Sequence, residues 1–111
     1  MLSDNRIILQ KLSPRTERKI AYLENLMVVV YDFADGPMKS PEPPHSHHHE
    51  QITYVAAGEL KFFKNDMEYF LKEGDIITIQ PEVSHCIQTV SKRVKLVDSF
   101  NPIREDFLEL P

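Results

Sequence analysis

The sequence predicts a single all-β domain, built as a sandwich or barrel of antiparallel strands. Its 111 residues are enough to form one hydrophobic core. Short segments rich in β-branched and aromatic residues recur along the chain, and Gly, Pro, Asn and Asp residues separate them about every eight positions. No segment shows the 3.6-residue apolar periodicity of a long helix.

The expected elements follow from these turn signals. An N-terminal arm at 1–15 carries one short strand at 7–9, and a strand at 19–23 is followed by a turn at Glu24 and Asn25. The strand at 26–33 is β-branched and aromatic almost throughout, which indicates burial on both faces. Further strands are expected at 51–57, 60–64, 67–71, 76–79, 85–90 and 94–100, before a C-terminal tail at 101–111 that contains one helical turn.

Proline dominates the segment that precedes the strand at 51–57. Residues 37–44 contain four of the eight prolines. Because proline has no N–H group, such a segment cannot pair centrally in a sheet. We expect a stiff, extended segment without ladder bonds, which delivers the residues after it to a preorganised site. A plain surface loop is the alternative.

Charge and composition exclude several classes of partner. The chain has 13 basic and 17 acidic residues, a net charge of −4, and no basic cluster that would bind nucleic acid. No apolar run approaches the roughly 20 residues of a membrane-spanning helix. The N-terminus lacks the apolar core of a signal peptide, so a cytoplasmic location is expected. The single cysteine, Cys86, cannot form a disulfide framework, and we expect it to be packed.

Histidines are the strongest functional signal. Four of the five lie within residues 45–49, and the fifth, His85, is far along the chain. Imidazole is the commonest protein ligand for transition metals, and residues at i and i+2 share one face of an extended segment. We expect His45, His47 and His85 to bind one divalent metal, with Gln51 as the fourth ligand. The donor set suits zinc, iron, nickel, copper or manganese.

The alternative is a solvated histidine-rich loop or the remnant of an affinity tag. A tag is disfavoured because the run is internal, is interrupted by Ser46 and leads directly into a strand.

The spacing of the ligands also predicts a bend in the chain. On a straight strand His47 and Gln51 would be about 13 Å apart. Two ligands that each lie about 2 Å from one ion cannot span that distance, so the chain must bend or bulge between them. We expect His48 and His49 to lie at the mouth of the barrel without binding metal, and Glu50 to point away from Gln51.

A carboxyl group stands on the core-facing side of the last strand. Val94, Leu96, Asp98 and Phe100 share one face of that strand, and only Asp98 among them is polar. A buried carboxylate requires a partner or a chemical task. From the residues alone, a salt bridge or a hydrogen bond that braces a loop is the favoured interpretation, and a catalytic role is the alternative.

Two spaced motifs resemble those of the cupins. His45, His47, Gln51 and Gly58 match the pattern His-x-His-x3-Gln-x6-Gly of the first cupin motif, with Gln in the usual Glu position, and Gly74, Asp75, Pro81 and His85 resemble the second. The resemblance implies a double-stranded β-helix, or jelly-roll, barrel of two antiparallel sheets that takes in residues 1–111. It also implies a divalent metal at the four ligand positions, and a homodimer.

A narrower resemblance adds an activity. The run from His45 to Val55 and the pattern Asp-x-Phe-x-Pro-x-Arg-Glu-Asp-Phe at 98–107 resemble the pectin-degradation cupins of the KdgF type. That family opens the ring of 4,5-unsaturated uronates to linear keto-uronates, which implies a small anionic sugar as substrate. The resemblance makes Asp98 the general acid or base, with Gln51 assisting proton movement. It makes Arg104 the group that grips the substrate carboxylate, and Phe100 a surface for the sugar ring.

The chain departs from the family pattern at several positions. His48 replaces a usual Pro, Gln80 and Glu82 stand where the general second motif has Pro and Gly, and Thr89 stands where an Asn often follows. These departures bear on the substrate more than on the metal. A non-catalytic sugar-binding cupin, or another cupin enzyme such as a dioxygenase or an isomerase, is therefore the alternative.

Overall fold

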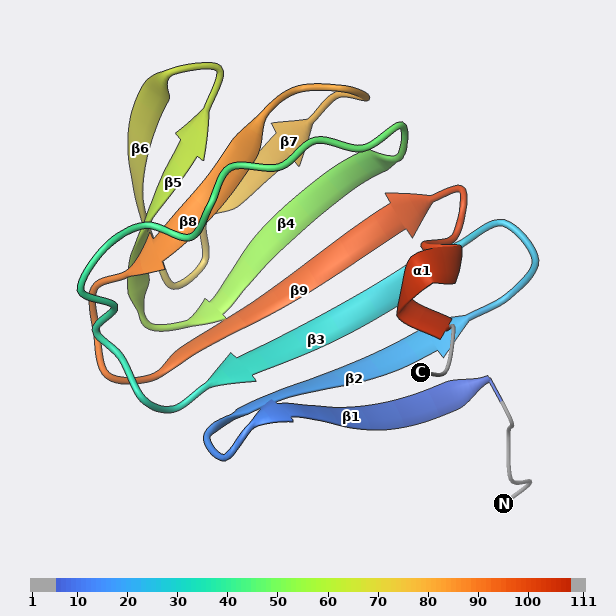
Figure 1. Ribbon diagram of the computed structural model, residues 1–111, viewed down its shortest axis with the longest axis horizontal. Helices are drawn as coiled ribbons and strands as arrows, with labels where there is room; N and C mark the ends of the chain where they lie inside the picture. Colours follow the sequence, from blue (N-terminus) through green and yellow to red (C-terminus); the bar gives the residue numbers. More distant parts are fainter. Residues whose placement is uncertain (1–5, 109–111) are drawn as a thin grey trace.

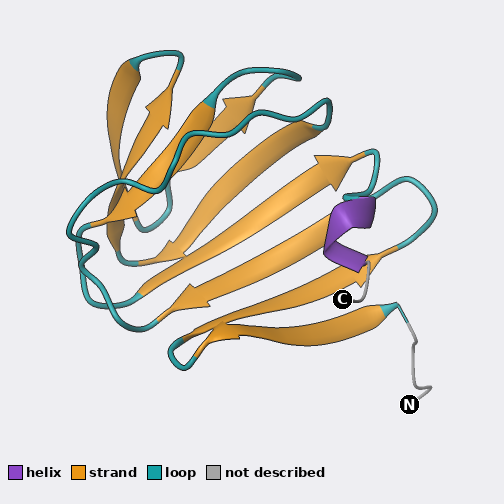
Figure 2. Cartoon of the chain, in the orientation of Figure 1, coloured by secondary structure: helices purple, strands orange, loops and turns teal. Residues whose placement is uncertain are grey.

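The chain folds into two antiparallel β-sheets with one short helix near the C-terminus (Figure 1, Figure 2). The computed structural model describes residues 6–108, so the first five residues of the expected arm and the last three of the expected tail lie outside the described residues. The elements are β1 (Ile7–Ser13), β2 (Thr16–Tyr22), β3 (Met27–Phe33), β4 (Glu50–Ala57), β5 (Glu59–Lys64), β6 (Met67–Lys72), β7 (Ile76–Ile79), β8 (His85–Thr89), β9 (Val94–Asn101) and α1 (Glu105–Leu108). The all-β prediction with two antiparallel sheets is confirmed.

The strand order places the last strand at the centre of the larger sheet. That sheet runs β1-β2-β3-β9-β4-β7, and the smaller one runs β6-β5-β8. β9 pairs with β3 on one side and with β4 on the other. Along β9 every second residue is buried, so Asp98 and Phe100 face the space between the sheets as the sequence predicts.

The N-terminal segment forms more sheet than expected. The strand expected at 7–9 continues to residue 13, and β1 pairs antiparallel with β2. Ile8 packs on the core, and Leu12 lines the cavity described below. The strand signal was weak because the polar residues Gln10 and Lys11 interrupt the apolar pattern.

The core between the sheets is built by alternating side chains of both. Its buried members are Phe33, Val55, Leu60, Phe62, Leu71, Ile77, Ile79, Ile87, Val94 and Leu96. Cys86 is also buried, as expected. β3 is fully buried at Met27, Val29 and Phe33 but only half-buried at the residues between them. The prediction of burial on both faces of this strand is therefore wrong for its outer face.

A second apolar cluster closes one end of the molecule. Ile20, Met27, Val29 and Phe100 are buried there, and Phe107 of α1 packs against them. The helical turn expected in the tail is confirmed, and it lies across the ends of β9 and β3 (Figure 1). Among residues 6–108, no helix is long and apolar enough to cross a membrane.

The proline-rich segment follows the open edge of β8 (Figure 1). Two of its N–H groups and that of the next residue, His45, donate to β8 carbonyls at 2.9–3.1 Å: Met38 to Thr89, Glu42 to Ile87 and His45 to His85. Pro41, Pro43 and Pro44 stand between these donors, where no ladder donor is required. The segment is therefore extended as predicted, but the expectation that it forms no ladder bonds is wrong. Its bonds to β8 fix the register that brings His45 beside His85.

Gly58 has a structural reason to be glycine. It lies in the turn between β4 and β5 with φ at +86°, a conformation that side chains rarely adopt. A Cβ atom there would also collide with the carbonyl oxygen of Arg93. This position of the first motif therefore serves the turn that follows β4.

Candidate active site and metal centre

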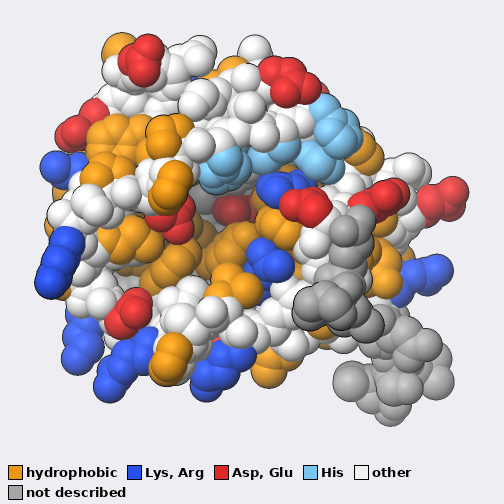
Figure 3. All heavy atoms as spheres, viewed as in Figure 1, with side chains coloured by type: hydrophobic (Ala, Val, Ile, Leu, Met, Phe, Trp, Pro, Cys, Tyr) orange, Lys and Arg blue, Asp and Glu red, His pale blue; other side chains and the backbone are white. Residues whose placement is uncertain are grey.

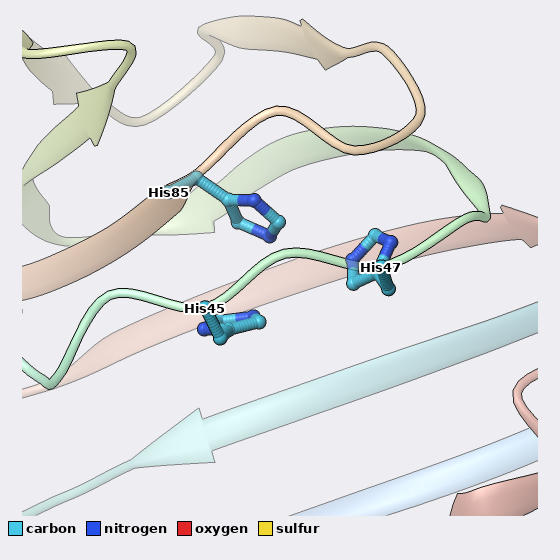
Figure 4. Close-up of side chains that lie close together, drawn as sticks. All are labelled: His45, His47 and His85. Atoms are coloured by element: carbon cyan, nitrogen blue, oxygen red, sulfur yellow. The ribbon is translucent and has the colours of Figure 1, made fainter.

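Three histidine rings from two distant segments converge on a common space (Figure 4). His45 and His47 come from the segment before β4, and His85 is the first residue of β8 and bridges to His45. One ring nitrogen of each lies within 4.8 Å of the others. Two ligands at about 2.1 Å from one ion are at most about 4.2 Å apart. Small ring rotations would therefore close the three rings on a metal.

A backbone carbonyl holds one nitrogen of each ring, so the other nitrogen is the one that can face a metal ion. His85 Nδ1 donates to a carbonyl at 2.8 Å, His47 Nδ1 donates to another at 3.2 Å, and His45 is bonded to the carbonyl of Pro43. The Nε2 atom of His85 is buried and has no hydrogen-bond partner. A neutral imidazole that is held in this way keeps its second nitrogen unprotonated, which is the usual arrangement of a metal ligand.

Gln51 lies beside these rings because the chain bends as predicted. The bend falls at His48 and His49, and it brings His47 Nε2 to 3.0 Å from Gln51 Oε1. Both atoms are acceptors, since His47 carries its proton on Nδ1 and the Gln51 amide group donates to Thr53 Oγ1 at 2.9 Å. Two facing acceptors repel unless a proton or a cation lies between them. The donors present therefore fit a metal ion.

Partial removal from water favours the neutral form of the three histidines, the least buried of which is His45. Desolvation lowers the pKa of His45 and His47, and it lowers the pKa of His85 to about 4. The positive charge of Arg104 adds to the effect in each case. Neutral imidazoles are available as ligands at pH 7, and three of them with one neutral amide would leave the charge of a divalent ion uncompensated.

The remaining histidines differ from one another. His48 is exposed, as is Glu50. His49 is only 6% exposed, its ring stands edge-on to that of His47 at 5.2 Å, and its carbonyl oxygen accepts the His47 Nδ1 proton. The expectation that His49 lies at the mouth is therefore wrong. It supports the His47 ring instead.

Asp98 is connected to Gln51 through one hydroxyl group. Thr53 is fully buried, and it accepts from Gln51 Nε2 and donates to Asp98 Oδ1 at 2.7 Å. Burial raises the pKa of Asp98 to about 7, although the Thr53 hydrogen bond and the charge of Arg104 both act to lower it. Neither the salt bridge nor the loop-bracing bond favoured from the residues alone is present in the described chain. The carboxyl group can carry or release a proton near neutral pH.

Arg104 and Phe100 are the remaining residues predicted for the site. Arg104 donates from Nε and Nη2 to the two carboxylate oxygens of Asp106 at 3.1 and 2.8 Å. Its guanidinium carbon lies 4.2 Å from the centre of the Phe107 ring and 5.3 Å from that of Phe100. Phe100 is 2% exposed and meets the His47 ring edge-on at 5.8 Å. The forked edge expected to grip a substrate is thus already occupied by Asp106.

A cavity of about 480 Å³ joins these groups. His45, Gln51, His85, Asp98, Phe100 and Arg104 all line it. Figure 3 shows the hollow below the row of histidine side chains, with basic and acidic atoms around it. The cavity brings together all the predicted site residues except His47, whose ring adjoins it through Gln51.

Sequence reasoning missed four polar residues that line the same cavity: Arg18, Tyr31, Glu42 and Thr53. Arg18 stands two residues before the buried Ile20 on the inward face of β2. The alternation that singled out Asp98 on β9 was therefore available for Arg18 as well. Thr53, two residues after Gln51, was likewise readable from the alternation of β4.

Fold and site together define a cupin. A family model described as the cupin domain matches residues 30–100, and the chain belongs to this family.

Individual relatives show which cupins the chain is most informatively compared with. The chain is 34% identical to the pectin degradation protein KdgF of Dickeya dadantii (strain 3937) over 101 residues. This alignment covers 89% of each protein. The structure of KdgF from Halomonas sp. superposes with a TM-score of 0.78 at 28% identity, over 90% of this chain and 92% of that one. An RmlC-like cupin from Shewanella frigidimarina NCIMB 400 gives a TM-score of 0.80 at 26% identity, over 96% and 93%. The chain is thus a relative of KdgF over nearly its whole length.

Proposed function

We propose that this chain is a metal-dependent enzyme that opens the ring of 4,5-unsaturated uronates to give linear keto-uronates. The relatives named above support the choice, since the Dickeya protein is described as a pectin degradation protein. The observation that carries the proposal is one cavity, lined by two of the three clustered histidines and adjoined by the third, that also holds a buried carboxyl group with a pKa of about 7 and two guanidinium groups. These supply metal ligands, a proton carrier and a cationic environment for an anionic sugar.

The reaction is an isomerisation and requires no co-substrate. The 1-hydroxyl group loses its proton, the bond between C1 and the ring oxygen breaks, and C1 becomes an aldehyde. The enol that remains at C5 becomes a ketone when C4 takes up a proton. The enzyme must therefore accept one proton and deliver one, which is the work of a general acid–base group.

Asp98 is assigned this proton transfer. A carboxyl group with a pKa of about 7 is divided roughly equally between its two forms at neutral pH, so it can act in both directions. Thr53 occupies Oδ1 of Asp98 with its hydroxyl proton. The other oxygen, Oδ2, is left to exchange a proton with a bound sugar. Phe100, which lines the same cavity, offers an apolar surface to the ring.

A divalent metal held by His45, His47, His85 and Gln51 would polarise an oxygen of the substrate. Thr53 accepts the Gln51 amide proton and so turns the amide oxygen toward the histidines. Gln51 is therefore assigned the role of ligand. A part in proton movement would require the Gln51 amide group to flip, so that its nitrogen faces the histidines.

The test follows the far-ultraviolet absorbance of the C4=C5 double bond. Metal-loaded protein is added to unsaturated monouronates from a pectate-lyase digest, and NMR identifies the product. We expect rapid loss of absorbance, which stops after chelation and is absent in Asp98→Asn protein with the same metal content. Decay no faster than with heat-inactivated protein would reject this substrate. Sugar binding without turnover in either protein would indicate a binding module, and oxygen consumption would indicate a dioxygenase.

A further inference from the structure

We propose that Arg18 of β2, rather than Arg104, holds the carboxylate of the anionic sugar in this cavity. The proposal rests on the proposed function only for the identity of the sugar. Arg18 and Arg104 both line the cavity, and both guanidinium groups lie over the ring of Phe107. The guanidinium carbon is 3.9 Å from the ring centre for Arg18 and 4.2 Å for Arg104. The two groups differ in what already binds them.

Arg104 has a carboxylate partner. Its Nε and Nη2 atoms both donate to Asp106, which forms a bidentate pair along one edge of the guanidinium group. The Arg104 side chain is 12% exposed, whereas that of Asp106 is 56% exposed, so the guanidinium group is shielded from water although its carboxylate partner is not. The negative charge of Asp106 offsets that of Arg104, and a substrate carboxylate would have to displace Asp106 to bind the same edge.

Arg18 has no acidic partner among residues 6–108. Its Nε donates to Gln10 Oε1 at 2.5 Å, and its Nη1 contacts the hydroxyl oxygen of Tyr31 at 3.4 Å. A guanidinium group has five N–H donors, and three are left over, including both on Nη2. The unoccupied end of the fork has the geometry that binds a carboxylate with two parallel hydrogen bonds.

The contacts of Arg18 also hold it in position. Gln10 accepts from Arg18 and donates to the carbonyl oxygen of Phe107 at 2.8 Å, so it joins β1, β2 and α1. The Phe107 ring covers the guanidinium plane. A cation that is fixed before the ligand arrives loses little freedom on binding, which favours affinity. The remaining carboxyl groups of the cavity, Asp98 and Glu42, both have a pKa raised by burial, so they compete weakly for this charge.

The experiment measures binding and turnover separately. Calorimetry on metal-loaded protein compares galacturonate with galactose, which carries a CH2OH group in place of the carboxylate. We expect the parent protein to prefer galacturonate, and Arg18→Gln to weaken galacturonate binding at least tenfold while galactose binding is unchanged. For the unsaturated uronate, KM should rise by a similar factor with a smaller change in kcat.

Two further variants serve as controls. Arg93→Gln removes the same charge from an exposed pair with Asp32 and should leave galacturonate binding unchanged. Arg18→Lys keeps the charge but not the fork, so its galacturonate affinity should lie between those of the parent and Arg18→Gln. It also serves as the working variant if Arg18→Gln fails to fold, and thermal melting and metal content establish the integrity of each protein.

The outcomes separate this proposal from the proposed function. Turnover of unsaturated uronates with full galacturonate affinity in both Arg18 variants would overturn the role of Arg18 and leave the function standing. A galacturonate preference that depends on Arg18, without turnover, would support the anion site and overturn the function. No preference and no turnover in the parent protein would overturn both.

Discussion

Replacing Asp98 by asparagine should stabilise the metal-free protein at high pH. The pKa of this carboxyl group is about 7 in the folded chain and 3.8 without the fold. The folded state therefore binds more protons than the unfolded state between these values, and the free energy of unfolding falls as pH rises through them. The Asn side chain keeps an oxygen that can accept from Thr53 and has no charge to bury.

The size of the effect follows from linkage. From pH 5 to pH 7 the unfolded carboxyl group is ionised and the folded one is largely protonated, so stability falls by about 1.4 kcal/mol per pH unit. Above pH 7 the loss levels off. The advantage of Asp98→Asn over the parent should therefore grow by about 2.7 kcal/mol between pH 5 and pH 8. The histidines titrate in both proteins, and their contributions cancel in the difference.

Urea denaturation at pH 5 and pH 8, with a chelator present, measures this difference. Chelation is required because a nearby divalent cation would itself lower the pKa of Asp98. Asp66→Asn is the matched control, since Asp66 is exposed in a turn and has a positive φ that asparagine tolerates. An advantage of Asp98→Asn that is equal at the two pH values would refute the reasoning.

Three other predictions concern the metal ligands and the surface. His85→Ala should weaken metal binding at least tenfold in competition with a chromophoric chelator, whereas His48→Ala, which removes an exposed ring, should not. Thr53→Val should also weaken metal binding about tenfold, because it frees the Gln51 amide, whereas Thr53→Ser should bind metal as the parent protein does. Equal metal affinity in the Val and Ser variants would contradict the role of the hydroxyl group. We also propose that a second copy covers an apolar patch on the outer face of β4 and β7. Tyr54 and Ile76 lie opposite each other there, 42% and 63% exposed, and an apolar patch can pair with its own copy about a two-fold axis. Tyr54→Lys should then shift the sedimentation coefficient from dimer to monomer, and a monomeric parent protein would contradict the proposal.

The sheets could be predicted from the sequence because burial in a strand has a two-residue period. On β9 the buried and less buried residues alternate without exception from Val94 to Asn101. The period fails where polar side chains serve the interior. Gln10 and Arg18 both face inward, and their polar character weakened the strand signal of the N-terminal segment.

The candidate site could be predicted in part for a different reason. A ligand spacing constrains the backbone, so His47 and Gln51 required a bend that the structure contains at His48 and His49. The role of Asp106 could not be anticipated in the same way. Its pairing with Arg104 depends on how α1 turns the chain after β9, and two residues of separation fix no geometry in an irregular segment.

The hydrogen-bonded link between Gln51, beside the histidines, and Asp98 depends on strand register. Thr53 lies opposite Asp98 in the pairing of β4 with β9, and Gln51 lies opposite Phe100. A slip of either strand by one residue would turn that strand's two side chains to the outer face, because side chains alternate along a strand. The hydroxyl of Thr53 can bond both neighbours only in this register, and it then orients the Gln51 oxygen toward the histidines and leaves one Asp98 oxygen free. The chemistry of this cavity is therefore specified by the pairing of two central strands as much as by the histidines themselves.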